Sequence, residues 1–224
     1  RTVEIGLIGK YVELKDSYKS ITESFIHAGA ANEVEVKIRW IHSEHLTEKN
    51  AASTCKGLDG LLVAPGFGER GFEGKVATVQ YARENKIPYF GICYGMQAAV
   101  IEYARNVLGY TDANTTEVNP KTSKPVIALM DEQMHITDKG GTMRLGAQQC
   151  ELAEDSIARA AYGEAHIKER HRHRYEFNND FKDVLTKAGL KATGINPDSG
   201  LVEIIEVEDH PFFVGVQYHP EYKS

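Results

Sequence analysis

The sequence predicts an α/β fold: a three-layer, doubly wound domain built on a mostly parallel central sheet, with additional antiparallel strands. Two observations lead to this prediction. In the first half, short apolar runs alternate with amphipathic segments of ten or more residues, the pattern of parallel strands joined by helices that cover both faces of a sheet. The second half is less regular and consists mainly of strand-like runs.

The elements of the first half follow from apolar spacing. Val3–Gly9 is a short apolar run ending in glycine, as buried strands often do. Glu33–Ile41 alternates apolar and polar residues, which predicts a half-buried strand. Asp16–Ala30 has apolar residues at helical spacing, which predicts a helix that Gly29 brings to an end. The same criteria predict strands at Leu58–Ala64 and Ile87–Ile92 and helices at Lys75–Lys86 and Met96–Leu108.

In the second half, five apolar runs predict strands and two segments predict helices. The strands are Val126–Met130, Met143–Leu152, Lys191–Ile195, Leu201–Val207 and Phe212–Gln217, and the helices are Ser156–Tyr162 and Asn179–Ala188. We find no internal repeat, low-complexity tract or linker-like stretch in the sequence. We therefore expect residues 1–224 to form one domain.

Composition excludes some classes of function. The chain has 224 residues, of which 42% are hydrophobic and 26% charged, with a formal net charge of -6; these values are typical of globular enzymes. An acidic chain lacks the basic footprint of a general nucleic-acid binder, although a local arginine cluster could still hold a small anion. No apolar run is long enough to span a bilayer, so we expect no membrane association.

The cysteines and the N-terminus point to a reducing compartment. Three widely spaced cysteines, Cys55, Cys93 and Cys150, form no C-x-x-C pair, and their odd number fits a disulfide framework poorly. The sequence enters a strand directly after Arg1, without a signal peptide. We expect a cytoplasmic protein, and the abrupt start suggests a piece of a longer polypeptide.

The principal motif is the strand–turn–helix segment around Cys93, with the pattern G-x-C-x-G from Gly91 to Gly95. Small residues on both sides of a nucleophile permit the sharp turn of a nucleophile elbow. Such a turn raises the thiol to the carboxyl edge of the sheet and places it at a helix N-terminus, where positive potential favours thiolate. A buried structural role is the commonest alternative for a free cysteine.

A second motif, His219-Pro220-Glu221, follows the last predicted strand. Histidine suits the role of a general base that takes a proton from a thiol and returns it to the leaving group. A carboxylate two residues later could orient the imidazole and stabilise its protonated form. H-P-E alone is a weak signal that also fits a surface turn, but combined with an upstream elbow cysteine it is strong.

With these motifs, the sequence resembles the class I, or triad-type, glutamine amidotransferases, which hydrolyse glutamine and pass ammonia to a second active site. The resemblance implies a catalytic triad of Cys93, His219 and Glu221. It also implies an oxyanion hole formed by the backbone N–H groups of Gly66, in the glycine-bearing loop after the third strand, and of Tyr94. A tight surface turn is the alternative for that loop.

Further segments along nearly the whole chain narrow the resemblance to the CTP synthase family. They are residues 9–14, 16–20, 66–75, 104–107, 114–117, 140–148 and 169–176. Two positions depart from that family's usual pattern: proline replaces a loop glycine at Pro65, and tyrosine replaces leucine at Tyr94. Because proline has no N–H to donate, Gly66 is the expected donor, and the Tyr94 ring is expected to alter the pocket or its gate.

The resemblance also implies how glutamine is held. Glu117 would bind the α-amino group and Arg174 the α-carboxylate, with which a guanidinium can form two parallel hydrogen bonds. The backbone of the elbow and Gln97 would complete the pocket. The full set of implied glutamine-binding residues is Gly66, Tyr94, Gly95, Met96, Gln97, Glu117 and Arg174.

The run from Arg170 to Arg174 allows other interpretations. His171 and His173 could be metal ligands, or the segment could bind nucleic acid. Neighbouring cations would repel a metal, and five residues are too few for nucleic acid in an acidic chain, so we favour an anion site. For residues 9–11, 69–75 and 140–148, structural or interface roles are favoured over chemistry, with 69–75 a solvated loop or part of a lid and GTP-responsive interface.

The resemblance implies partners outside this chain. CTP synthases make CTP from UTP, ATP and glutamine, GTP stimulates their glutaminase activity, and the family forms homotetramers. This chain contains no G-x-x-x-x-G-K-[ST] loop for ATP phosphates. We therefore expect no cofactor here, and we expect ATP, Mg²⁺ and UTP in an N-terminal synthetase domain that this chain lacks. Alternatives are the glutaminase of another amidotransferase, a γ-glutamyl hydrolase, and an inactive regulatory or assembly domain.

Overall fold

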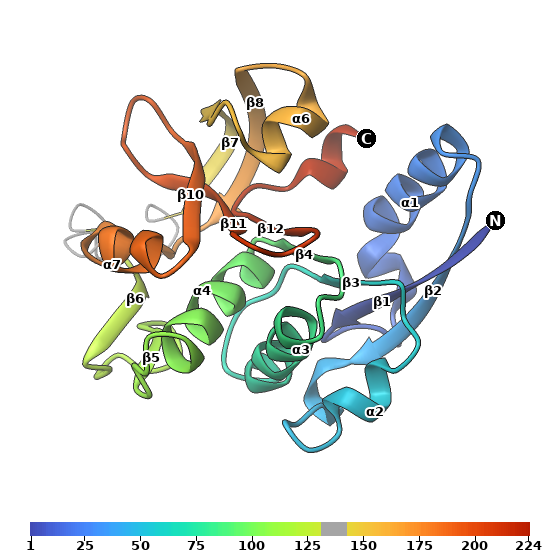
Figure 1. The fold of residues 1–224 in the computed structure, drawn as a ribbon, viewed down its shortest axis with the longest axis horizontal. Helices are drawn as coiled ribbons and strands as arrows, with labels where there is room; N and C mark the ends of the chain where they lie inside the picture. The colour runs from blue at the N-terminus through green and yellow to red at the C-terminus, as the bar shows by residue number, and fades with distance from the viewer. Residues whose placement is uncertain (131–142) are drawn as a thin grey trace.

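The computed structural model describes residues 1–130 and 143–224, and in them a nine-stranded sheet forms the centre of the molecule (Figure 1). The strand order is β2-β1-β3-β4-β12-β11-β10-β7-β8. One half of the sheet is parallel and the other antiparallel. This arrangement confirms the predicted α/β fold with added antiparallel strands.

The parallel half consists of four strands from the first half of the chain and the last strand. Its members are β1 (Thr2–Gly9), β2 (Glu35–His42), β3 (Gly60–Val63), β4 (Tyr89–Ile92) and β12 (Phe213–Val216). Strands β3 and β4 are short and buried almost throughout, as expected of strands covered on both faces. The last strand, β12, lies directly beside β4 in parallel.

The antiparallel half continues the sheet from β12. It consists of β11 (Val202–Val207), β10 (Leu190–Ile195), β7 (Arg144–Leu152) and β8 (His166–His173). A second, three-stranded sheet contains β5 (Ala113–Thr115), β6 (Lys124–Ala128) and β9 (Glu176–Phe177). The sequence did not predict β5, β8 or β9. Of the segment 140–148, residues 140–142 lie outside the described residues.

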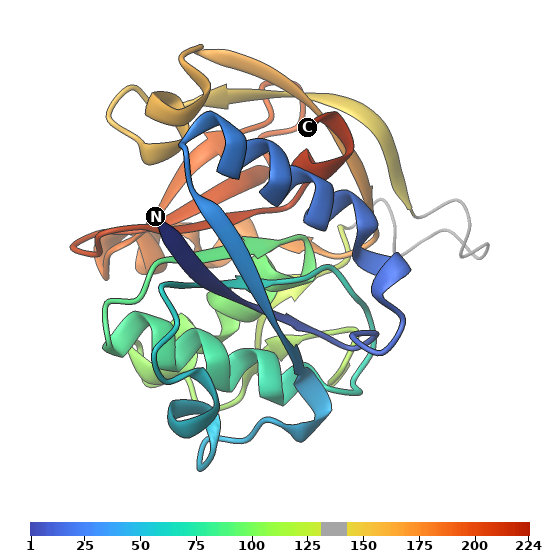
Figure 2. The same ribbon diagram turned by 90° about the vertical axis from the view of Figure 1, so that its right-hand side faces the viewer.

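Helices lie on both sides of the sheet (Figures 1 and 2). The α-helices are α1 (Lys19–Ala31), α2 (Ala51–Cys55), α3 (Phe72–Glu84), α4 (Tyr94–Asn106), α6 (Ile157–Tyr162) and α7 (Lys182–Lys187). Short 3-10 helices span Lys15–Tyr18, Ser43–His45, Asn179–Phe181 and Pro220–Lys223. In Figure 1, α3 and α4 lie on one side of the central strands and α1 and α6 on the other.

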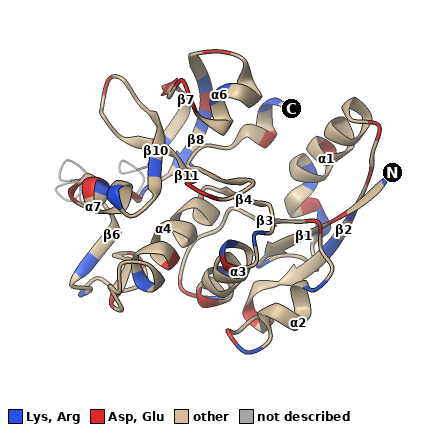
Figure 3. Ribbon diagram, in the orientation of Figure 1, with Lys and Arg blue, Asp and Glu red and all other residues tan. Residues whose placement is uncertain are grey.

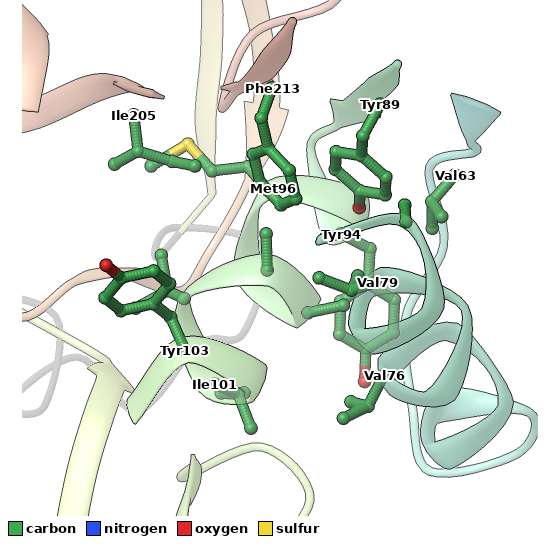
Figure 4. Packing of buried hydrophobic residues seen from close by; sticks show 14 of the residues in the cluster. Val63, Val76, Val79, Tyr89, Tyr94, Met96, Ile101, Tyr103, Ile205 and Phe213 are labelled. Carbon is green, nitrogen blue, oxygen red and sulfur yellow. The ribbon is translucent and has the colours of Figure 1, made fainter. Parts of the chain in front are cut away.

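The larger hydrophobic core joins α4 to its neighbours. Helix α4 is apolar around most of its circumference, as is typical of helices enclosed by other elements. It is accordingly buried from Tyr94 to Ala104. Figure 4 shows Tyr94 directed toward Val76 and Val79 of α3. The Tyr94 ring also stacks on Phe72, with 5.0 Å between ring centroids. The helix that follows the elbow is therefore held rigidly.

Charge is distributed over many elements. Figure 3 shows Lys and Arg interspersed with Asp and Glu along the ribbon. Within the described ranges, we find no helix of the length and apolarity that crossing a membrane requires.

Candidate active site

Cys93 occupies a sharp turn between β4 and α4. Its backbone has φ 54° and ψ -100°, a strained region for a residue with a side chain. The flanking glycines are required by close packing: a Cβ on Gly91 would lie 2.6 Å from the Gly95 carbonyl carbon, and one on Gly95 would lie 2.4 Å from the Val63 carbonyl oxygen. The structure thus forms the elbow that the sequence predicted.

The pairing of β4 with β12 determines which residues meet Cys93. Val216 pairs with Ile92 in parallel register, so both strands end at the same edge of the sheet. The Cys93 N–H then donates to the Val216 carbonyl at 2.7 Å. His219 follows three residues after Val216 and lines the same cavity as Cys93. The structure therefore brings together a nucleophile and a base that lie far apart in the sequence.

His219 is buried and paired with Glu221. Its Nδ1 lies 2.7 Å from Glu221 Oε1, which assigns Nδ1 as the donor to the carboxylate. Burial alone would lower the pKa of His219, but interaction with Cys93 and Glu221 raises it to about 10. Nε2 is buried and has no hydrogen-bond partner within the geometric limits among the described residues, although interaction with Cys93 contributes to the raised pKa of the ring. Catalytic hydrogen bonds are often long or poorly aligned in ligand-free active sites.

The predicted oxyanion loop lies against the elbow. A Cβ on Gly66 would be 3.3 Å from the Tyr94 ring, and the Tyr94 hydroxyl donates to the Gly68 carbonyl at 2.6 Å. The tyrosine that replaces the usual leucine therefore ties the glycine loop to α4. Pro65 precedes Gly66 in this loop and also lines the cavity.

Lys75, for which a solvated loop was one of the alternatives allowed by the sequence, is buried in α3, with 2% of its surface exposed. Its Nζ donates to the Ala64 carbonyl at 3.1 Å and lies 5.0 Å from the centre of the Tyr94 ring. No carboxylate forms an ion pair with it in the described part of the chain. Burial lowers the pKa of Lys75 from 10.5 to about 7, although Cys93 acts in the opposite direction. A solvated role for this residue was wrong.

We expect Lys75→Met to increase the free energy of unfolding at neutral pH. Between pH 7 and pH 10.5 the unfolded chain holds a proton that native Lys75 releases, so this group makes the native state more stable as pH rises. The penalty, at most about 5 kcal/mol below pH 7, disappears in the variant. Urea unfolding of both proteins across this range measures the difference, which should shrink toward high pH.

The control for this measurement is Lys49→Met, at an exposed position. Its stability should follow that of the wild type at each pH. If the Lys75 variant showed the same pH dependence as the wild type, the cost attributed to the buried ammonium would be wrong.

A cavity of about 510 Å³ opens beside Cys93 and His219. Four of the implied glutamine-binding residues converge on its wall: Gly66, Gln97, Glu117 and Arg174. The other three, Tyr94, Gly95 and Met96, are buried and are absent from the residues that line this cavity. Residues that the sequence did not predict to bind glutamine also form its walls, among them Tyr11, Ser17, Tyr18 and Tyr222.

Glu117 and Arg174 place opposite charges in this cavity. Burial raises the pKa of Glu117, while the Gly68 N–H and the nearby charges of Arg174 and Lys10 oppose the shift. The Gly68 N–H donates to Glu117 Oε1 at 3.0 Å, so the carboxylate also touches the glycine loop. A ligand carrying both an amino and a carboxylate group would meet a complementary charge at each end.

Two histidines of β8, His171 and His173, face inward and contact acidic side chains. His171 lies 2.9 Å from Glu203 and His173 lies 2.6 Å from Glu176, and Arg144 bridges Glu176 and Glu203 at 2.8 and 3.0 Å. Within residues 1–130 and 143–224, no cluster of three or more potential metal ligands is present. Along β8, the buried side chains that form this ionic network therefore alternate with exposed arginines.

A second cavity, of about 430 Å³, lies against strands β3, β4 and β12 and is almost wholly apolar. Cys93, His219 and Glu221 are not among the residues that line it. We therefore consider the cavity beside Cys93 to be the site of chemistry.

Comparison with known proteins identifies the family of the chain. The family model for class-I glutamine amidotransferases matches residues 13–224. CTP synthases of Flavobacterium psychrophilum and Clostridium acetobutylicum are 68% and 59% identical over 222 residues. Each match covers 99% of this chain but only 41% and 42% of the relative. The chain thus spans about two fifths of the length of these relatives.

Solved structures show the same relationship. The acivicin-bound glutaminase domain of Trypanosoma brucei CTPS superposes with a TM-score of 0.90 at 41% identity, covering 98% of this chain and 86% of that one. A glutamine amidotransferase from Thermotoga maritima, at 10% identity and a TM-score of 0.55, shares the fold. The match covers 98% of this chain and 76% of that one. The chain belongs to the class-I glutamine amidotransferase family.

Proposed function

We propose that this chain hydrolyses L-glutamine to glutamate and ammonia as the glutaminase domain of a CTP synthase. The observation that supports this most directly is that Cys93 and His219 line a cavity that also presents Glu117 and Arg174, while Glu221 pairs with Nδ1 of the His219 ring. A nucleophile, a base and two charged anchors for an amino acid are the components that amide hydrolysis of glutamine requires.

In the first half-reaction, the Cys93 thiolate attacks the side-chain carbonyl carbon of glutamine. A carbon–sulfur bond forms, and the carbonyl electron pair moves to the oxygen, which the backbone N–H groups of Gly66 and Tyr94 stabilise. Protonated His219 gives its proton to the amide nitrogen. The carbon–nitrogen bond then breaks, and ammonia leaves a glutamyl thioester on Cys93.

In the second half-reaction, neutral His219 takes a proton from water while the oxygen attacks the thioester carbonyl. The tetrahedral intermediate collapses, the carbon–sulfur bond breaks, and glutamate leaves with the Cys93 thiolate restored. Glu221 holds the His219 ring in the orientation that directs Nε2 toward the reacting atoms and stabilises its protonated form.

The names of the relatives suggest the destination of the ammonia. We propose that a separate N-terminal synthetase domain of the same polypeptide binds UTP, ATP and Mg²⁺ and uses the ammonia to make CTP. GTP acting at the interface between the two domains, assembly as a homotetramer and a cytoplasmic location complete the proposal. The high identity to CTP synthases over almost the whole chain supports this choice over other amidotransferases.

Labelling with a glutamine-mimicking electrophile tests the glutaminase proposal. Acivicin, which is bound in the Trypanosoma brucei structure, should give a single adduct on Cys93 that mass spectrometry locates after digestion, and excess glutamine should slow its formation. Ammonia release should occur from free glutamine rather than from γ-glutamyl peptides, and should increase when a CTP synthase amination domain and GTP are added. An unmodified Cys93 together with no ammonia release would refute the proposal.

The glutamine anchors give a separate prediction. Arg174→Lys keeps the positive charge but loses the two-pronged hydrogen bonding of the guanidinium, so KM for glutamine should rise by about 10-fold or more while kcat changes less. Steady-state ammonia release measures both constants. Arg170→Lys, four residues earlier on β8, is the control, since Arg170 is exposed. Equal KM values for the two variants would show that Arg174 does not bind the α-carboxylate of glutamine.

A further inference from the structure

The side chain of Gln217 lies against the nucleophile. Gln217 follows β12 and is completely buried, and its Nε2 lies 3.5 Å from Cys93 Sγ in hydrogen-bonding geometry. Its backbone N–H donates to the Glu203 carbonyl at 2.8 Å, which anchors it beside the sheet. Because Gln217 is shielded from solvent, water does not compete for this contact.

The orientation of the Gln217 amide follows from its neighbours. Gln97 Nε2 donates both to the Tyr175 carbonyl, at 3.0 Å, and to Gln217 Oε1, at 3.1 Å. A backbone carbonyl can only accept, so Tyr175 requires the nitrogen of the Gln97 amide at this position. That nitrogen in turn requires the oxygen of Gln217 to face Gln97. The NH₂ group of Gln217 is therefore the group that faces sulfur.

We propose that Gln217 is a further catalytic residue, which donates a hydrogen bond to the Cys93 thiolate through an amide chain that begins at the Tyr175 carbonyl. This inference deepens the proposed function and rests on Cys93 acting as its nucleophile. A thiolate accepts a hydrogen bond much more strongly than a thiol, because bonds to charged acceptors are stronger than those between neutral groups. The contact therefore favours the reactive form of the sulfur and fixes its position.

The donor complements the charged groups around the sulfur. Lys75 from α3 and His219 from the segment after β12 act electrostatically on Cys93, while Tyr94 and Tyr222 are close enough to be affected by its charge. His219 must give away its proton during the reaction. Gln217 keeps its proton throughout, so it can stabilise the thiolate both before attack and when the thioester is cleaved.

Alkylation of Cys93 by iodoacetamide, in which sulfur displaces iodide, tests this inference without glutamine turnover. Gln217→Leu has nearly the same volume but no donor. We expect Cys93 in this variant to be alkylated about 10-fold more slowly at neutral pH, and the midpoint of its rate–pH profile to lie about one unit higher. Mass spectrometry of the Cys93 peptide follows the reaction. Gln217→Met provides a second variant if the leucine variant fails to fold, as judged by circular dichroism.

The control is Gln80→Leu on α3, where the amide donates a hydrogen bond to the exposed Glu84. Its profile should match that of the wild type. An unchanged rate and midpoint in folded Gln217→Leu or Gln217→Met would overturn the inference even if wild-type protein hydrolysed glutamine. Conversely, wild-type protein that released no ammonia and formed no acivicin adduct on Cys93 would refute the proposed function, while the alkylation profiles would still report on Gln217.

Discussion

Cys93→Ala is expected to reduce kcat for glutamine hydrolysis by at least about 10⁴-fold without unfolding the protein. The methyl group cannot form the thioester, so the reaction loses its covalent intermediate. Cys93 is 5% exposed, and alanine leaves only a small gap at the base of the cavity. Ammonia release, measured together with the thermal unfolding midpoint, separates lost chemistry from lost structure.

The other two cysteines provide matched controls. Burial raises the pKa of Cys55 to about 11 and that of Cys150 to about 12, so both are neutral and unreactive near pH 7. Cys55→Ala and Cys150→Ala should keep near-normal kcat with a modest loss of stability. Near-normal turnover in Cys93→Ala would exclude Cys93 as the nucleophile.

His219→Asn is expected to lower kcat almost as far as Cys93→Ala does. The amide retains a polar group of similar shape but cannot exchange a proton with the sulfur, the amide nitrogen or water. Residues that act as a unit lose most of their effect when one member is removed. The variant that carries both substitutions should therefore lose little beyond the single variants, and single-turnover measurement of ammonia release would show this.

The same substitution should alter stability in a defined pH range. The pKa of His219 is raised from 6.5 to about 10, so its favourable interactions are fully present below pH 6.5 and are lost as pH rises through about 10. The free energy of unfolding of the wild type should therefore fall relative to that of His219→Asn as pH rises toward 10. A pH-independent difference would show that the protonated imidazole is not what these contacts stabilise.

The fold was largely predictable because the short strands β3 and β4 and helix α4 have strong local patterns. Strand β8 was not, because its alternation sets buried Glu169, His171 and His173 against exposed cations, and charge is the usual mark of a solvated segment. The sequence favours an anion site over metal ligation for the run from Arg170 to Arg174, and the structure pairs the two histidines of this run with carboxylates on β9 and β11.

The site was predictable where a motif dictates backbone shape, as at the elbow of Cys93 and the H-P-E turn. Lys75 and Gln217 could not be found in the same way. The contact of Lys75 with Ala64 depends on how α3 packs against the sheet, and that of Gln217 with Cys93 depends on the position of β12 within it. Lysine and glutamine are usually exposed, so their residue types do not predict burial beside a thiol. Such positions emerge only from tertiary structure.

The parallel pairing of β4 with β12 has a consequence for how this domain can vary. Four successive residue pairs, from Phe213–Tyr89 to Val216–Ile92, fix the two strand ends against each other. Loops within the long excursion of chain between α4 and β12 can therefore change in length without displacing the sulfur from the imidazole, while strands β8 and β11 of that excursion hold the segment after β12 through the Arg170 and Glu203 carbonyls. Divergence in those loops would adapt the domain to different neighbours while its chemistry stayed constant.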